Sequence, residues 1–168
     1  MLKSLAKPAP AAVSAAPTPD MAYLAARQFS PQWRDFLVTL AAELFGNFSA
    51  DEARGFFRQI GLRMAAEVKL PVVETLEGLE SVLNGRLSAM DWGLVKLSVE
   101  EDAIAIRHSA YPGQHLDEAS AEIWRRAFSA VLEGVYTVWL QTQGGRADME
   151  AKLRAESQAD GFEFAYGL

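Results

Sequence analysis

The stretch from Glu118 to Gln143 constrains this fold most, because it predicts one long helix that is apolar on nearly every side. The pair Gly144 and Gly145 follows as a helix stop. A helix at the surface of a domain carries an apolar stripe only about 100° wide. The apolar residues here cover far more of the circumference: Ile123, Trp124, Ala127, Phe128, Val131, Leu132, Val135, Tyr136, Val138, Trp139 and Leu140. We therefore expect this helix either at the centre of the fold or shared with another subunit.

Three shorter helices are predicted before it, over about 30–47, 49–70 and 73–85 or shortly after. Each has apolar residues at helical spacing. The second has the clearest start, because Ser49 and Glu52 have the spacing of a capping box, in which each residue satisfies a backbone amide of the other. The chain is therefore expected to be mostly helical.

A small antiparallel sheet is predicted beside these helices. Residues 92–99 and 103–109 are rich in β-branched side chains and flank an acidic turn, which is typical of a hairpin. Residues 162–166 alternate as a strand and are expected to add a third, because a hairpin alone is marginally stable. Residues 149–158 are predicted to form a short solvated helix. The expected fold class is α+β, with one mostly helical domain and a small antiparallel sheet (hairpin 92–109 plus a C-terminal strand).

The 168 residues suit one domain. Residues 1–20, rich in alanine and proline, are predicted to be a disordered tail, and residues 21–168 the domain. Prolines at 8, 10 and 17 interrupt any signal-peptide core, so no export signal is expected. The longest apolar run, "FSAVLEGVYTVWL", is too short to span a bilayer and contains Glu133. A cytoplasmic location is the resulting expectation.

Composition and motifs argue against several functions. The net charge of −6 disfavours a nucleic-acid partner, and the absence of cysteine removes thiolate metal sites and cysteine nucleophiles. The adjacent acids of the turn, residues 100–102, cannot face each other across a sugar, so they are interpreted as a solvated turn. His108 and His115 match no ligand spacing and are expected to be hydrogen-bonded at element boundaries. No enzyme activity, metal or cofactor is expected.

The aromatic residues on the helices are expected in the core or at an interface rather than in a sugar-stacking platform. Gly134, inside the longest helix, predicts a close approach of another backbone, from the same subunit or from a symmetry mate. The candidates for oligomer contacts or packing are Trp124, Phe128, Gly134, Tyr136 and Trp139. Tyr23, Arg27 and Gln28 lie where the tail meets the first helix, and they are candidates for contact with an extended ligand.

The run "GLRMA…LEGLESVLNGRLSAMDWGLVKLSVEEDAIAIRHSAYP", followed by "FSAVLEGVYTVWLQTQGG", resembles the D subunit of the bacterial cellulose synthase complex. The resemblance covers residues 34–145. Its specific parts are the entry Trp92-Gly93, the exit "IRHSAYP", and "VLEGVY" with Trp139 and Gln143 beyond it. The Ala/Pro-rich N-terminus and "QHLDEASAE" match weakly, so glucan contacts near the family's N-terminus do not transfer residue by residue.

The resemblance implies a non-catalytic accessory protein of cellulose biosynthesis. Members of that family form ring-like octamers built from dimers, which order synthases or glucan chains for export and crystallisation into the biofilm matrix. The implied partners are further copies of this chain, other subunits of the cellulose synthase complex and β-1,4-glucan chains. The family is placed in either the periplasm or the cytoplasm, and the missing signal favours the cytoplasm for this chain.

The resemblance and the residue patterns meet at the long helix, because a homo-oligomer would bury its excess apolar area. The hairpin is interpreted as architectural: Trp92 packs over the sheet, Gly93 lets the backbone pass close to a helix, and His108 ends the second strand. An alternative interpretation is a small-molecule sensor or adaptor domain, with an apolar pocket under the long helix.

Overall fold

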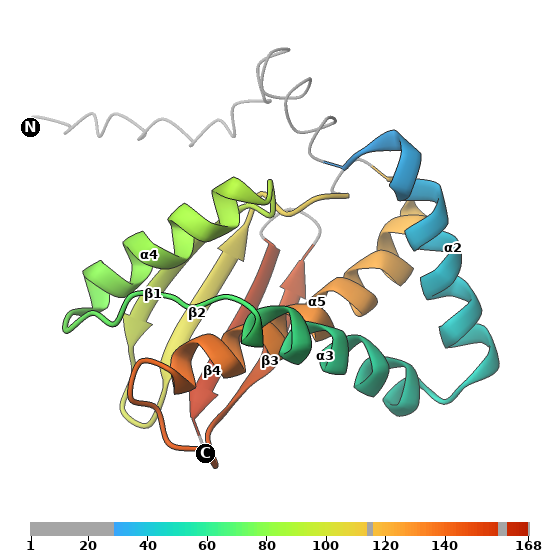
Figure 1. Ribbon diagram of the computed structural model, residues 1–168. Coiled ribbons are helices and arrows are strands. Elements are labelled where there is room, and N and C mark those ends of the chain that lie inside the picture. The colour runs from blue at the N-terminus through green and yellow to red at the C-terminus, as the bar shows by residue number, and fades with distance from the viewer. Residues whose placement is uncertain (1–28, 114–115, 158–160, 168) are drawn as a thin grey trace, which may run out of the picture.

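The structure is a computed structural model that describes residues 29–113, 116–157 and 161–167. Within these residues the chain folds into helices and one antiparallel sheet (Figure 1), which confirms the predicted α+β class. The elements in chain order are α2 (Pro31–Asn47), α3 (Ala50–Ala66), α4 (Leu76–Ala89), β1 (Leu94–Val99), β2 (Ile104–Ser109), α5 (Glu118–Gln141), β3 (Glu150–Ser157) and β4 (Gly161–Gly167). The predicted tail over 1–20 lies outside the described residues, as do Tyr23, Arg27, Gln28 and His115.

The molecule is layered around α5. The strands follow the order β1-β2-β4-β3, and α5 packs against one face of this sheet. α3 packs on the opposite side of α5, α4 lies along β1, and α2 contacts α5 at the far side from α4 (Figure 1). Side chains of the sheet alternate, so Leu97, Ile106 and Phe164 are buried on the face covered by helices while Lys96 and Arg107 face outward. The core therefore lies between the sheet, α5 and α3.

α5 is the centre of the fold, which settles one expectation drawn from its sequence. Fourteen of its 24 residues are buried by elements of the same chain. Its excess apolar area is covered by α3 on one side and by the sheet on the other, so it does not need a second subunit. The sequence-based idea that α5 exposes more apolar surface than one domain can cover is therefore wrong.

α3 and α5 approach each other so closely that their backbones touch at two glycines. A Cβ atom placed on Gly134 would lie 2.3 Å from the carbonyl oxygen of Arg58 in α3. A Cβ atom on Gly61 would lie 2.0 Å from the carbonyl oxygen of Val131 in α5. The sequence allowed two neighbours for Gly134, a helix of the same chain or a symmetry mate. In the structure the neighbour is α3 of the same chain.

The C-terminal part of the sheet contains one correction. β4 pairs with β2 over residues 162–166, as predicted for the third strand. The preceding segment, expected as a solvated helix, is instead strand β3, which pairs with β4 and contains a β-bulge between Leu153 and Ala155. Lys, Glu, Ala, Leu and Arg favour helices when considered alone, but pairing with β4 and contacts with α5 outweigh that preference.

Side chains from the helices cap both edges of the sheet. On β1, the Asn84 amide of α4 donates to the Val95 carbonyl and accepts from the Val95 amide, and Glu80 accepts from the Leu97 amide. On β3, Thr137 of α5 accepts from the Ala151 amide and Glu133 accepts from the Leu153 amide. These backbone groups are therefore not available to pair with another strand.

Replacing Asn84 with alanine is expected to open the edge of β1. The Val95 amide and carbonyl would lose their partners, at a cost of about 1–3 kcal/mol in the free energy of unfolding. Chemical denaturation measures this loss, and light scattering on heating should detect earlier aggregation. The matched control is Ser81→Ala on the exposed side of the same helix, which should change little. Equal stabilities of the two variants would contradict the capping role.

Candidate functional site

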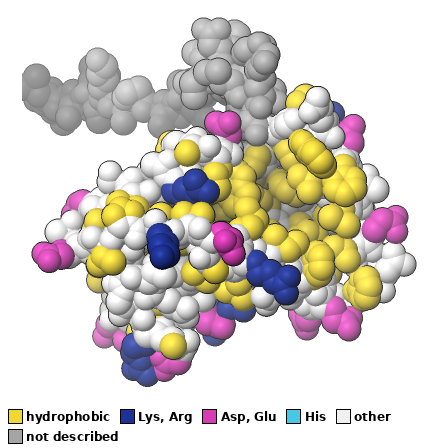
Figure 2. Space-filling model, viewed as in Figure 1, with side chains coloured by type: hydrophobic (Ala, Val, Ile, Leu, Met, Phe, Trp, Pro, Cys, Tyr) yellow, Lys and Arg dark blue, Asp and Glu magenta, His cyan; other side chains and the backbone are white. Residues whose placement is uncertain are grey.

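An apolar groove lies between α2, α3 and α5 in the described structure. It has a volume of about 410 Å³. Figure 2 shows it as a hollow surrounded by hydrophobic side chains, on the side where α2 and α3 lie. Its lining residues come from these helices, from the residue before the N-cap of α2, and from the connections α4–β1 and β2–α5: Phe29, Trp33, Leu37, Leu40, Phe57, Ile60, Met64, Trp92, Pro112, Trp124, Ala127, Phe128 and Val131. Every one of them is apolar, so the groove offers contact area and almost no hydrogen bonding.

The groove is open because α2 packs loosely. Ala41 is the buried residue of this 17-residue helix, and the large side chains of Trp33 and Leu37 are left facing the groove. Its floor is firm, because Trp124 and Phe128 of α5 stack with their ring centroids 5.4 Å apart. Phe29 lies against Trp124 at a centroid distance of 4.7 Å, at the point where the described chain begins.

A ridge of exposed aromatic residues lies on the same two helices, outside the groove. Phe36 of α2 is 58% exposed, Phe48 between the helices is 55% exposed, and Phe56 of α3 is 49% exposed. All three lie on the α2–α3 hairpin, whose inner side also lines the groove. We call these three residues the aromatic ridge.

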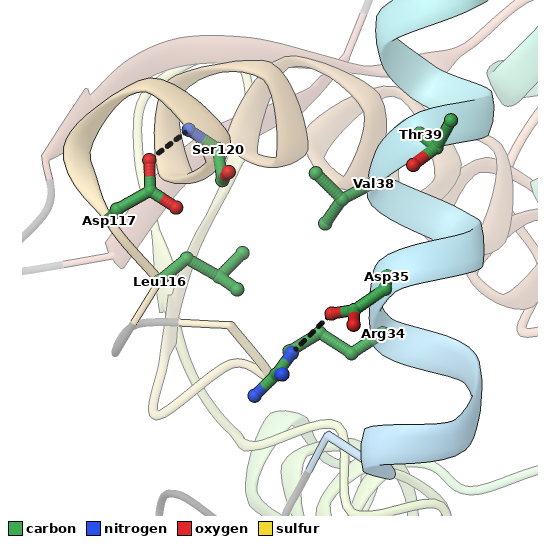
Figure 3. A pocket seen from close by; sticks show the side chains of 7 residues that line it. All are labelled: Arg34, Asp35, Val38, Thr39, Leu116, Asp117 and Ser120. Carbon is green, nitrogen blue, oxygen red and sulfur yellow. Dashed lines mark hydrogen bonds and ion pairs between the residues drawn. The ribbon is translucent and has the colours of Figure 1, made fainter.

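A second, polar cleft separates α2 from the start of α5 (Figure 3). Arg34, Asp35 and Thr39 of α2 face Leu116, Asp117 and Ser120 across it. Its charges are already engaged locally, since Arg34 Nε lies 2.9 Å from Asp35 and Asp117 accepts from the Ser120 amide as the N-cap of α5. Hydrogen bonds from the Ser120 side chain and then from its backbone amide hold the pKa of Asp117 below its usual value. The charged side chains of the cleft are therefore explained by a local ion pair and by helix capping.

His108 is fully buried beneath α5, and both ring nitrogens have partners. Its Nε2 lies 2.8 Å from the carbonyl oxygen of Trp92, and its Nδ1 lies 2.5 Å from the hydroxyl oxygen of Tyr136. A carbonyl only accepts, so Nε2 carries the proton and Nδ1 accepts from Tyr136. Burial lowers the pKa of His108 to about 4 and raises the pKa of Tyr136. His108 is therefore neutral, and it ties β2, α5 and the entry to β1 together.

Trp92 and Gly93 have other neighbours than the sequence indicated, which were the sheet for Trp92 and a helix for Gly93. Trp92 packs edge-on against Phe128 of α5, with ring centroids 5.1 Å apart. Gly93 does not pass close to a helix: it has φ +103°, and a Cβ atom there would lie 2.3 Å from the carbonyl oxygen of Ser109 at the end of β2. Only glycine tolerates both conditions. Within 100–102 the residues are exposed and form the hairpin turn.

The structure divides the aromatic candidates into two groups. Trp139 and Tyr136 are buried in the core, whereas Trp124 and Phe128 form the floor of the groove. Trp33, which was expected in a core or an interface, is 59% exposed at the groove wall. The sequence offered an apolar pocket under the long helix only with the alternative function, and it did not place the groove between α2, α3 and α5, because that depends on how α2 docks and not on the periodicity of any one helix. Among the described residues, no group of three or more acidic or histidine side chains is placed to hold a metal ion.

An α+β domain with an apolar groove and an exposed aromatic ridge has the features of a binding or assembly module. Comparison with known families gives the particular family. Residues 19–167 match the family model that describes the D subunit of cellulose synthase. The chain therefore belongs to the family of the cellulose synthase D subunit, as the resemblance over 34–145 implied.

Curated relatives agree with the family match. The chain is 31% identical over 117 residues to "Cellulose synthase operon protein D" of Komagataeibacter xylinus, which covers 68% of this chain and 73% of the relative. The protein of the same name from Komagataeibacter sucrofermentans matches with the same identity and coverage. In the part of the chain that the structure describes, no helix is both long and apolar enough to cross a membrane.

Proposed function

We propose that this protein is a non-catalytic accessory subunit of bacterial cellulose biosynthesis, which assembles with itself into a ring-like scaffold. The scaffold orders synthase complexes or nascent glucan chains, so that the product is exported and crystallises well. Family membership supports the pathway, and the aromatic ridge of Phe36, Phe48 and Phe56 is the observation that carries the assembly. A closed ring built from dimers, with an octamer as the expected size, is the form we propose.

The positions of the apolar side chains favour helix-mediated assembly. The edges of β1 and β3 are capped by Asn84, Glu80, Thr137 and Glu133, which opposes assembly by sheet extension. The exposed aromatic residues lie instead on α2 and α3 and their junction. Burial of three half-exposed aromatic rings against a second copy supplies the apolar core that stable interfaces need.

The test is the mass of the purified protein in solution. The wild type is expected to form a particle larger than a dimer at micromolar concentration. The double variant Phe36→Glu/Phe56→Glu should give smaller particles with an unchanged circular dichroism spectrum, because burying two charges at an interface is costly. Light scattering coupled to gel filtration measures both. A monomeric wild type would refute the scaffold.

The matched control is Val72→Glu. Val72 is 75% exposed, in the connection between α3 and α4, and lies away from the ridge, so its variant should assemble like the wild type. In a Komagataeibacter strain that lacks its own operon protein D, the wild-type chain and Val72→Glu should restore cellulose crystallinity by X-ray diffraction, whereas the ridge variant should not.

Family membership supports two further proposed partners, namely other subunits of the cellulose synthase complex and β-1,4-glucan chains. Tyr23, Arg27 and Gln28 remain glucan-contact candidates because of their position before the first helix, and a cytoplasmic location remains the expectation from the sequence. A second candidate function, a small-molecule sensor or adaptor, is favoured by one observation. The groove volume of about 410 Å³ lies in the range of small-ligand pockets. A co-purified apolar molecule, found by mass spectrometry, would favour that function.

A further inference from the structure

The apolar groove and the aromatic ridge adjoin each other on both helices of the α2–α3 hairpin. On α2, the ring of Phe36 lies beside Trp33 of the groove wall, with ring centroids 6.1 Å apart. On α3, the ring of Phe56 lies beside Phe57, another groove residue, with ring centroids 5.8 Å apart. Each helix therefore presents a groove residue and a ridge residue side by side.

The spacing along α2 places its ridge residue toward the open side of the groove. Phe36 follows Trp33 by three residues and precedes Leu40 by four, and residues at these spacings share one side of a helix. Trp33 and Leu40 both line the groove. One side of α2 therefore carries both a groove wall and an exposed aromatic ring.

The ridge does not fill the groove of its own chain. Phe36 and Phe56 are absent from the groove lining, and they are 58% and 49% exposed. The groove walls are open as well, since Trp33 is 59% and Met64 is 40% exposed. Two copies brought together can cover both features at once, and removal of apolar surface from water is favourable.

The aromatic rings of this surface supply much of the area that a stable pair needs. A fully buried aromatic side chain removes roughly 150–250 Å² from water. Four half-exposed rings therefore offer roughly 300–550 Å² per chain. These rings belong to Trp33, Phe36, Phe48 and Phe56. A standard interface buries about 800 Å² on each partner, so the rings supply about half of it and other groove residues add to that area.

The surfaces that meet are nearly free of charge. Residues 36–42 of α2 read "FLVTLAA" and contain no ionisable side chain. The groove lining contains none either. Arg34 and Asp35, which precede this stretch, form an ion pair with each other. The cores of protein interfaces are likewise depleted in charged residues, so a second copy can enter the groove without desolvating a charge there.

We propose that Phe36 of one copy inserts into the groove of a second copy, between Trp33 and Met64, and that Phe36 of the second copy inserts into the first groove in return. Such a contact closes after two copies, because a two-fold pair uses the same patch on both chains. The inference rests on the proposed self-assembly and names the contact that forms the dimers. The ring then needs a different contact between dimers.

Disulfide trapping tests this contact, because the natural chain contains no cysteine. Phe36→Cys is mixed with an equal amount of affinity-tagged Met64→Cys and oxidised mildly. Crosslinked pairs with one chain of each variant should form at least about tenfold faster than in a mixture of Phe36→Cys with Val72→Cys, because the contact raises the local thiol concentration. Val72 is 75% exposed but lies between α3 and α4. Denaturing electrophoresis without reductant measures both rates.

The possible outcomes separate this contact from the scaffold. Equal rates with Met64→Cys and Val72→Cys would overturn the proposal, and so would pairs of Phe36→Cys with itself in place of mixed pairs. A groove filled by a co-purified molecule or by another segment of the same chain would block the mixed pairs and overturn it as well. Particles larger than a dimer without mixed pairs would leave the scaffold standing, whereas mixed pairs in a protein no larger than a dimer would support the contact and refute the ring.

A second experiment uses charge complementation in place of thiols. Phe36→Glu and Met64→Arg should each weaken pairing, because each places a charge in an apolar contact. In a mixed pair, the new carboxylate of one chain meets the new guanidinium of the other, while the second contact stays native. The dissociation constant of this pair should be at least about tenfold lower than that of Phe36→Glu with Val72→Arg, measured by analytical ultracentrifugation. Equal constants, with every variant folded by circular dichroism, would rule out the reciprocal contact.

Discussion

Gly134→Leu is expected to destabilise this protein strongly. The new side chain would enter the contact between α5 and α3, where even a Cβ atom lies 2.3 Å from the Arg58 carbonyl oxygen and 2.6 Å from the Leu62 amide nitrogen. Two backbones cannot move apart without unpacking both helices, so the loss should exceed about 3 kcal/mol in the free energy of unfolding. Chemical denaturation followed by circular dichroism measures it.

Gly134→Ala is also expected to lower the free energy of unfolding, but by less than Gly134→Leu. The gain in helix propensity, about 1 kcal/mol, does not cancel the cost of the added methyl group, because the neighbouring atoms belong to a backbone and cannot rotate away. The matched control is Gly55→Ala in α3, where nothing lies within 4 Å and the substitution should stabilise by about 0.5–1 kcal/mol. Similar effects at the two positions would contradict the close crossing.

The second large effect expected is a loss of stability in mild acid that depends on His108. Its pKa is about 4 in the folded protein, against 6.5 in an unfolded chain. Between these values the unfolded state binds more protons, so the free energy of unfolding falls as the pH falls from 6.5 toward 4. A shift of this size corresponds to about 3 kcal/mol, fully present above pH 6.5. Denaturation curves at several pH values between 6.5 and 5 isolate this group from the carboxylates.

The control removes the titrating group and its partner together. His108→Phe alone leaves the Tyr136 hydroxyl and the Trp92 carbonyl unpaired, at about 1–3 kcal/mol for each buried group. The double variant His108→Phe/Tyr136→Phe also removes the unpaired hydroxyl, so it should recover part of the lost free energy of unfolding. Both variants should show a flatter dependence on pH between 6.5 and 5. An unchanged slope in either variant would show that another group controls the response to acid.

Local patterns in the sequence predicted most elements, because those elements depend on local chemistry. The capping box at Ser49 and Glu52 forms as expected, and the alternating residues 162–166 become strand β4. The error at β3 arose because its residues favour a helix, while its strand form depends on distant partners such as Thr137 and Glu133. Strand identity at this position is set by tertiary contacts.

The candidate site was less predictable than the fold. The sequence placed Trp33 and Trp124 on apolar stripes, but it did not indicate that they would lie on the wall and the floor of one groove. A groove is a property of the spacing between helices, and periodicity within one helix contains no information about that spacing. For the same reason the sequence could not decide whether α5 is central to the fold or shared with another subunit. Its burial between α3 and the sheet shows that it is central.

The position of β4 has a consequence for synthesis on the ribosome. β4 follows every other described element in chain order, yet it lies between β2 and β3 in the interior of the sheet. Phe162 and Phe164 of this strand complete the apolar layer under α5. The nascent chain therefore holds α5 without its full cover until residues 161–167 leave the exit tunnel. Helices α2 to α4 emerge early, but the sheet closes only after translation has passed this strand.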